Sequence, residues 1–363
     1  METLIAKFNG NLCSLQFYDQ GTGKKDGSSF AWPSSLILPE ENFHYIKISP
    51  TDDSSTKFSG FTKLTFLNKD SIERDIEELI FGDGFKCIEL DPKTVFNSVG
   101  VIVRKVSFPS TLEFFISDEI VDGVKNSSGG NGKSLLNELD FSKCKNLSFN
   151  NNFLVYWKVK KVNLYGAGSS VSPIPVFDTG SINCLGYLKL LILPERYEVR
   201  DSSFFNIDTA SGVVGISRKS SGTENFCTII ANTMVVNPEL KCFASSNSSV
   251  FNCCNINNFY IKSISTLQTT KTVPSGFNLF KNCRIGNLYI TEEIVDEFFN
   301  LNFRFDNTTV DRLYVFRTGL SKPTNWLFIF NFKQALGLSS LITEKFITDV
   351  TYDEAVKEII EES

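Results

Sequence analysis

The chain has 363 residues, and with 42% hydrophobic side chains it has ample material for a buried core. Its formal charge of −5 comes without a basic stripe, which excludes nucleic acid as an expected partner. The longest fully apolar runs fall far short of the ~20 residues of a membrane-spanning helix, so we expect two or three domains or one long repeat array and no membrane span.

The N-terminal residues predict a β-hairpin. Leu4, Ala6 and Phe8 alternate with other residues before Asn9-Gly10, a pair that favours a tight two-residue turn, and apolar residues resume at Leu12. Residues 19–30 are polar and glycine-rich, typical of a loop. We therefore interpret residues 1–33 as an N-terminal hairpin cap with a loop. The opening residues lack the basic and apolar regions of a signal peptide.

From about residue 34 to 316, short apolar-x-apolar steps recur, mostly at intervals in the twenties, where solenoid repeats of a strand plus a return segment lie. The interval from Leu64 to Leu79 is too short for a full unit, which indicates a misplaced anchor, and Val214 could supply a further step in the longest interval. The first residues of the predicted steps are Leu64, Leu79, Val106, Leu139, Val162, Leu191, Met234, Phe259, Leu288 and Leu313.

Nearly the same eleven-residue phrase begins at Phe251, Phe280 and Phe305, as FNCCNINNFYI, FKNCRIGNLYI and FDNTTVDRLYV. A short strand completes its backbone hydrogen bonds by stacking in parallel on copies of itself. The repeated phrase predicts one packing unit per copy, in which the Phe and the Cys or Thr fill the space between layers. Residues 34–316 are thus expected to form a parallel-sheet solenoid.

The end of the chain predicts helix. The segment QALGLSSLITEKFITDV looks like a transition into helix after the repeats stop at Phe316. In TYDEAVKEIIEE, Thr351 and Glu354 form a capping box, and the apolar side chains Val356, Ile359 and Ile360 share one helix face. Because a solenoid needs its open ends covered, we interpret residues 317–363 as a C-terminal helical cap.

Two details resemble the irregular leucine-rich repeats of BspA-like proteins. ELDFSKCKNL (138–147) and FSGFTKLTF (58–66) share Phe-Ser-x-Cys/Phe-x-x-Leu, and strands run into proline in LILPE (36–40), VSFPSTLE (106–113) and LILPE (191–195). The sequence departs from the family where Val99, Ile229 and Thr308 replace the Cys. The resemblance implies a mainly β, curved solenoid with one parallel sheet that acts as an adhesion or interaction module, without catalytic residues.

No motif predicts a cofactor or a metal. The nine cysteines form no C-x-x-C pair, and His44 is the single histidine. We read the thiols, Cys144, Cys254 and Cys283 among them, as free and buried, which favours cytoplasmic production over classical secretion. Residues 127–134 (SSGGNGKS) lack the first glycine of a P-loop and predict a flexible loop. Carboxylate pairs such as Glu77-Glu78 are interpreted as solvated edges.

The candidate site is the outward residue of each step. In the three eleven-residue phrases these residues are Tyr260, Tyr289 and Tyr314, which parallel stacking would align as a strip of rings. Two positions earlier, with the same facing, lie Asn258, Asn287 and Arg312. The alternative is a packing ladder beneath a capping segment. The other expected outward residues are Thr65, Ile80, Ser107, Asp140, Asn163, Ile192 and Val235.

These observations predict a non-catalytic module that binds a protein or a glycan through the exposed face of its repeat sheet. Two alternatives stay open at this point: a structural component of a larger assembly, such as a phage virion or fibre, and a β-solenoid carbohydrate-active enzyme with two acids across a cleft.

Overall fold

A computed structural model of the chain describes two compact units, an N-terminal unit (residues 1–149 and 153–173) and a C-terminal unit (150–152 and 174–363). The protein is mainly β, with parallel strands that form a β-solenoid. The described residues are 2–9, 12–19, 36–37, 45–48, 61–68, 74–81, 83, 86–90, 101–117, 136–149, 153–154, 159–171, 174–177, 181–182, 188–199, 204–205, 207–208, 213–214, 227–236, 249–266, 278–294, 304–317 and 340–362. His44, Val99, the loop at 127–134 and most of the 19–30 loop lie outside them.

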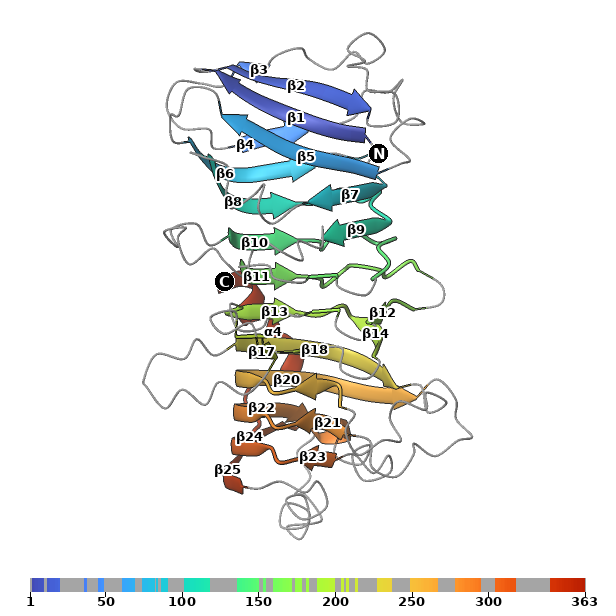
Figure 1. Ribbon diagram of the computed structural model, residues 1–363. Coiled ribbons are helices and arrows are strands. Elements are labelled where there is room, and N and C mark those ends of the chain that lie inside the picture. Colours follow the sequence, from blue (N-terminus) through green and yellow to red (C-terminus); the bar gives the residue numbers. More distant parts are fainter. Residues whose placement is uncertain are drawn as a thin grey trace. The chain divides into compact units, whose positions relative to one another are not determined.

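The N-terminal unit contains a parallel sheet in which the predicted steps stack in register (Figure 1). Its strands, in spatial order, are β4 (Tyr45–Ile48), β6 (Arg74–Phe81), β8 (Val101–Ser107), β10 (Leu136–Asp140) and β11 (Val159–Asn163). The anchors Leu79, Val106, Leu139 and Val162 lie opposite one another on successive strands and are fully buried. Ile46 pairs with Leu79 and is a step that the sequence analysis missed.

A second sheet of the same unit contains the predicted hairpin. Its order is β3 (Leu36–Ile37), β2 (Leu12–Asp19), β1 (Glu2–Asn9), β5 (Phe61–Asn68), β7 (Cys87–Leu90) and β9 (Phe114–Ser117). The hairpin β1–β2 is confirmed, but β1 also pairs in parallel with β5, so the hairpin is part of a larger sheet. Leu64 lies in β5, opposite Leu4, which explains the interval that was too short.

Aromatic rings fill the core of the N-terminal unit. Phe81, Phe108 and Phe141 follow equivalent steps on β6, β8 and β10, and their rings stack with centroids 5.8 and 4.1 Å apart. Phe115 meets Phe108 and Phe141 of this stack edge-on, and Phe153 packs edge-on against Phe115 and at a tilt against Phe141. All five side chains are buried, so the high phenylalanine content supplies rings that stack from one rung to the next.

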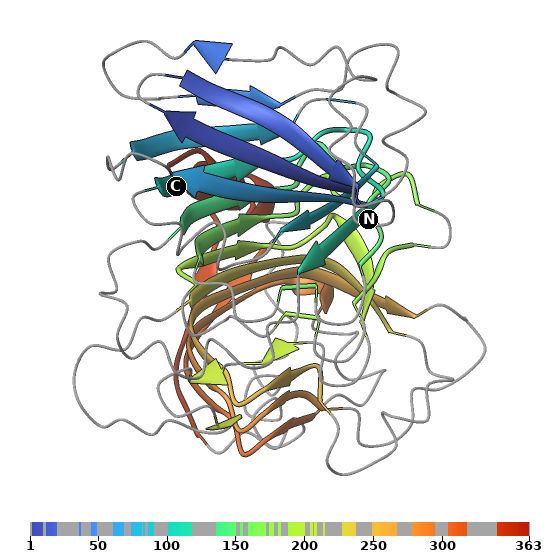
Figure 2. The same cartoon turned by 45° about the horizontal axis from the view of Figure 1, so that its top comes forward.

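The C-terminal unit is built around a second run of parallel strands. In order these are β13 (Leu190–Ile192), β18 (Cys227–Val236), β20 (Asn255–Thr266), β22 (Arg284–Thr291), β24 (Thr309–Phe316) and β25 (Ser340–Ile347). β14 (Arg196–Val199) pairs with the far end of β18 and with β12 (Val176–Phe177). β18 is long because it pairs with β13 near one end and with β14 near the other, and β20 pairs with β18 along the same length. Both strands curve along their length (Figure 2).

The anchor predicted in β18 was wrong. Ile229, not Met234, lies opposite Leu191 and Phe259, whereas Met234 pairs with Tyr197 and Ile264 at the other end of the strand. β18 is apolar over nearly its whole length, so several of its triplets fit an apolar-x-apolar step. The proposed extra step at Val214 was also wrong, because β17 (Val213–Val214) pairs antiparallel with β16 (Ile207–Asp208) outside this sheet.

Each eleven-residue phrase is a short strand, a corner and a long strand. Phe251, Phe280 and Phe305 lie in β19 (Phe251–Asn252), β21 (Asn278–Lys281) and β23 (Arg304–Asp306), which form a four-stranded sheet with β15 (Phe204–Phe205). The corner residues Cys253, Asn282 and Asn307 have positive φ angles of 55°, 55° and 52°. Asparagine tolerates this left-handed conformation better than most residues, so the phrase encodes a turn as well as packing.

The small side chains after these corners pack between layers, as predicted. Cys254 and Cys283 are free and buried, and Thr308 takes the equivalent place on the next rung. The Cys283 thiol donates to the Lys281 carbonyl at 3.2 Å, and the Thr308 hydroxyl donates to the Asp306 carbonyl at the same distance. The thiol and the hydroxyl therefore make equivalent hydrogen bonds, which explains why Thr can replace Cys at this position.

The C-terminal segment combines one wrong and one confirmed prediction. β25 pairs in parallel with β24 from Thr309↔Ser340 to Phe316↔Ile347, so the sheet continues where a transition into helix was expected. The helix α4 (Tyr352–Glu362) is confirmed. So is its capping box, because the Glu354 carboxylate accepts from the Thr351 amide at 2.9 Å while the Thr351 hydroxyl lies 3.3 Å from the Glu354 amide.

Candidate functional site

The predicted tyrosine strip lies on the parallel sheet of the C-terminal unit. Tyr260, Tyr289 and Tyr314 are direct neighbours on β20, β22 and β24. Beyond Tyr260 the same row continues through Ile230 on β18 and Ile192 on β13. The ring centroids of Tyr260 and Tyr289 are 4.1 Å apart with planes 2° from parallel, and those of Tyr289 and Tyr314 are 4.6 Å apart at 10°. The expected alignment is confirmed.

Helix α4 covers one end of this strip. The buried side chains Tyr352 and Val356 pack against Ile192, Ile230 and Tyr260, and the half-buried Ile359 and Ile360 flank them. Tyr260 is only 8% exposed and meets the ring of Tyr352 edge-on. At this end of the strip, the rings therefore form a packing ladder beneath a capping segment, which is the alternative that the sequence left open. The prediction that Ile192, Val235 and Tyr260 are exposed was wrong, because all three are buried.

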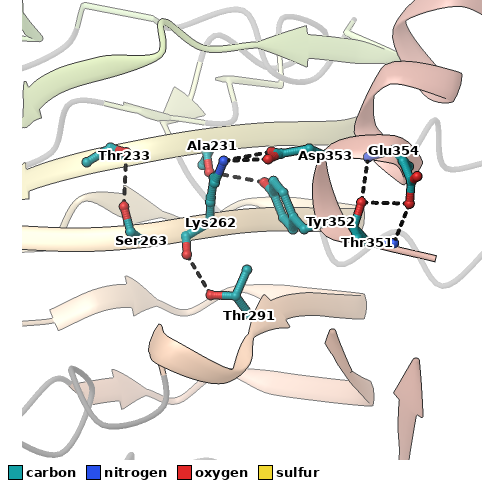
Figure 3. A network of polar contacts seen from close by, with 9 residues as sticks. All are labelled: Ala231, Thr233, Lys262, Ser263, Thr291, Thr351, Tyr352, Asp353 and Glu354. Atoms are coloured by element: carbon teal, nitrogen blue, oxygen red, sulfur yellow. Dashed lines mark hydrogen bonds and ion pairs between the residues drawn. The ribbon is translucent and has the colours of Figure 1, made fainter. Parts of the chain in front are cut away.

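Polar contacts fix α4 on the sheet (Figure 3). The Lys262 ammonium donates to both carboxylate oxygens of Asp353, at 2.8 and 2.7 Å, and the Tyr352 hydroxyl reaches the Ala231 carbonyl at 3.5 Å. Burial raises the pKa of the Tyr352 hydroxyl well above its ordinary value. Among the described residues, the helix is therefore held by apolar packing, the Tyr352 hydroxyl contact and the exposed Lys262–Asp353 ion pair.

The other end of the strip is more open. Tyr289 and Tyr314 are half-buried, and the neighbouring Arg312 is exposed. Burial raises the pKa of the Tyr289 hydroxyl, and the positive charge of Arg312 offsets part of this rise. This end thus presents two parallel rings beside a guanidinium group, a combination that offers rigid contact area and directed hydrogen-bond donors.

The two predicted asparagines are engaged within the sheet. Asn258, Asn287 and Arg312 share one row, as expected. The Asn287 amide donates to the Asn258 side-chain oxygen at 2.8 Å, and the Asn258 amide donates to the Thr228 hydroxyl at 3.1 Å. This ladder links three strands, so its amides stabilise the stack, and Arg312 is the member of the row that extends into solvent.

The N-terminal unit carries a charged ladder that was not predicted from the sequence. Glu78, Lys105, Glu138 and Lys161 are register neighbours on β6, β8, β10 and β11, with alternating charge. The Lys105 ammonium lies 3.7, 3.3 and 3.6 Å from carboxylates of Glu78, Glu138 and Asp140. Burial acts to lower the Lys105 pKa, but these three carboxylates outweigh it and raise the pKa. Glu78 is therefore not the solvated edge that its sequence context indicated.

A cavity of about 370 Å³ opens beside this ladder. Its lining combines strand residues Glu78, Lys105 and Ser107 with residues from the following corners. The Ser110 amide and hydroxyl both donate to Asp83, at 3.0 and 2.8 Å. The sequence contained a signal for this cavity, because the successive outward residues Ser107 and Asp140 are both polar. The tyrosines were chosen as the candidate site instead.

Comparison with known proteins identifies no matching family model, no similar curated protein and no similar solved structure. In the part of the chain that the structure describes, no group of three or more His, Cys, Asp or Glu side chains is arranged to hold a metal ion. None of the described helices has the length and apolar character needed to cross a membrane.

Proposed function

We propose that the chain is a non-catalytic interaction module that recognises a protein or a glycan through the outer face of its repeat sheet. The binding residues are Tyr289, Tyr314 and Arg312, at the end of the tyrosine strip that α4 leaves open. Tyr260, which α4 covers, supports the binding residues by stacking its ring on that of Tyr289. The observation that carries this proposal is the pair of parallel, half-buried rings beside an exposed guanidinium.

Ordered rings bind a partner at low entropic cost. Stacking between rungs restricts Tyr289 and Tyr314 before any partner arrives, so binding freezes little additional side-chain motion. Tyrosine and arginine are also the residue types that concentrate binding energy at interfaces. The face of the rings suits apolar groups of a protein or the C–H faces of a sugar, while Arg312 supplies directed donors.

The test is an affinity capture from the native source, followed by mass spectrometry, with a double variant. Tyr289→Ser/Tyr314→Ser should lose the captured partner and weaken its binding by ~2 kcal/mol or more, while Tyr260 keeps the α4 contact intact. Tyr165→Ser removes an exposed tyrosine from the N-terminal unit and serves as the matched control. If the double variant keeps its thermal unfolding midpoint and still binds the partner like the control, the proposal is wrong.

The likeness to BspA-like leucine-rich repeats remains part of this proposal. It is supported by parallel strands whose anchors stack in register and by thiols that fill equivalent slots. The proposal of a structural role in a larger particle makes a different prediction: the chain would sediment with that particle, and the tyrosine double variant would sediment with it equally well.

A further inference from the structure

We propose that the cavity beside the charged ladder of the N-terminal unit is a separate binding site for a small polyhydroxylated ligand, a monosaccharide or disaccharide unit. This site shares no residue with the tyrosine strip, so the inference does not depend on the function proposed above. It is carried by the volume of the cavity and by the distribution of donors and acceptors around it.

The cavity has the size of a small-molecule site. Its volume of about 370 Å³ falls within the range of roughly 300–1,000 Å³ that is usual for such sites. The exposed residues Asp83, Ser110 and Lys143 lie among its lining and place its mouth at the solvent, while Phe81 and Phe108 are buried beneath it. A ligand could therefore enter without displacing any described strand.

The lining charges favour a neutral ligand. The ionisable groups are three carboxylates, from Glu78, Asp83 and Asp140, and two ammonium groups, from Lys105 and Lys143. The ladder already pairs Lys105 with Glu78 and Asp140, so neither sign dominates. A strongly anionic ligand would meet the carboxylates, and a strongly cationic ligand would meet the ammonium groups. Because positive and negative groups nearly balance, the cavity disfavours both strongly anionic and strongly cationic ligands.

The same lining is dense in hydrogen-bonding groups of both kinds. Carboxylates only accept hydrogen bonds, ammonium groups only donate them, and a ligand hydroxyl does both. Several adjacent hydroxyls can therefore bridge carboxylate and ammonium groups that lie next to one another, as Asp140 and Lys105 do. Lys143 has no ion pair with any residue that the structure describes, so its ammonium is available to a ligand oxygen. Half-buried Ile80 offers an apolar contact for ring C–H groups.

Two lysines of one loop provide a matched pair of variants. Lys143 and Lys145 are both exposed, but only Lys143 lines the cavity. Lys143→Ala should weaken saccharide binding about tenfold, the effect of one lost charged hydrogen bond, whereas Lys145→Ala should leave it unchanged. Asp140→Asn provides a second variant, because an amide keeps the oxygen that accepts from the Ser142 amide while it removes the charge.

The experiment screens the full chain by saturation-transfer NMR against hexoses, N-acetylhexosamines and disaccharides, with inorganic phosphate and a simple alkylamine as charged probes. Calorimetry then gives dissociation constants for the wild type and the variants. We expect at least one saccharide to bind, Lys143→Ala and Asp140→Asn to weaken it, and Tyr289→Ser/Tyr314→Ser to leave it unaltered. Binding of no saccharide, preference for a charged probe, or equal binding by Lys143→Ala and Lys145→Ala would overturn the inference.

Discussion

At the scale of single residues, the buried thiols show how one small slot accepts two chemistries. Cys254, Cys283 and Thr308 occupy successive rungs after left-handed corner residues. The Cys254 amide lies 3.4 Å from the Cys283 sulfur, and the Cys283 amide lies 3.3 Å from the Thr308 hydroxyl oxygen. The Cys283 and Thr308 side chains thus each accept from the backbone of the preceding rung, which requires a small side chain with a sulfur or oxygen atom at this position.

Burial makes the thiols of Cys144 and Cys254 poor nucleophiles. It raises the pKa of Cys144 and raises that of Cys254 well above its ordinary value. We therefore predict that a thiol-specific reagent at pH 8 modifies Cys144, Cys254 and Cys283 only after unfolding in urea, because all three sulfurs are buried and the reagent cannot reach them in the folded state. Peptide mass spectrometry would identify the modified positions, and labelling of Cys254 at equal rates with and without urea would contradict the prediction.

The same shifts set a direction for stability against pH. A folded-state pKa above the unfolded value means that the unfolded chain loses its protons first. The stabilising contribution is complete below about pH 8.5, the unfolded thiol value, and is lost as the pH rises further. Tyr197 and Tyr352, whose pKa values burial also raises, add to this loss above about pH 10. Urea unfolding at pH 7, 9 and 10.5 should therefore give a falling free energy of unfolding.

At the scale of elements, local signals were predictive where the element is stabilised locally. The capping box and the apolar face of α4 are both contained in twelve residues, and the sequence predicted them. The β25 strand was missed because it is stabilised by pairing with β24, a separate segment of the chain. The local sequence SLITEKFI alone does not distinguish a strand from a helix. Ile229 was missed because β18 is buried on both faces and offers no alternation.

The cap of α4 gives an element-scale prediction. Thr351→Ala removes the hydroxyl that lies 2.7 Å from the Glu354 carboxylate and should destabilise the helix by about 1 kcal/mol. Amide hydrogen exchange over residues 353–360 should accelerate by roughly fivefold, the equivalent of that free energy. Thr348→Ala, an exposed threonine before the helix, is the matched control. Equal exchange in the two variants would show that the cap does not stabilise α4.

At the scale of the whole molecule, the sequence predicted a parallel solenoid and the alignment of the three tyrosines, and the structure contains both. Repetition made this possible, because three copies of one phrase must stack alike. The covering of Tyr260 by α4 could not be predicted in the same way. Tyr260 and Tyr352 are far apart in the chain, and only the folded structure brings the helix to this end of the sheet. The charged cavity was missed for a different reason, because the polar outward residues Ser107 and Asp140 were recognised but not interpreted as a site.

The last repeats stack in one register, which places the tyrosines in a single strip. Asn287 and Arg312 are direct neighbours in this register, whereas Tyr314 lies two residues further along β24. Opposite residues on adjacent strands are ~4.8 Å apart, within disulfide range, and a partner two residues further along lies at roughly 8 Å, outside it. Variants Asn287→Cys/Arg312→Cys and Asn287→Cys/Tyr314→Cys therefore test the register under mild oxidation, with peptide mass spectrometry to separate the new disulfide from the native cysteines. We expect a disulfide in the first variant and none in the second; a disulfide in the second variant alone would show that the strands pair in another register.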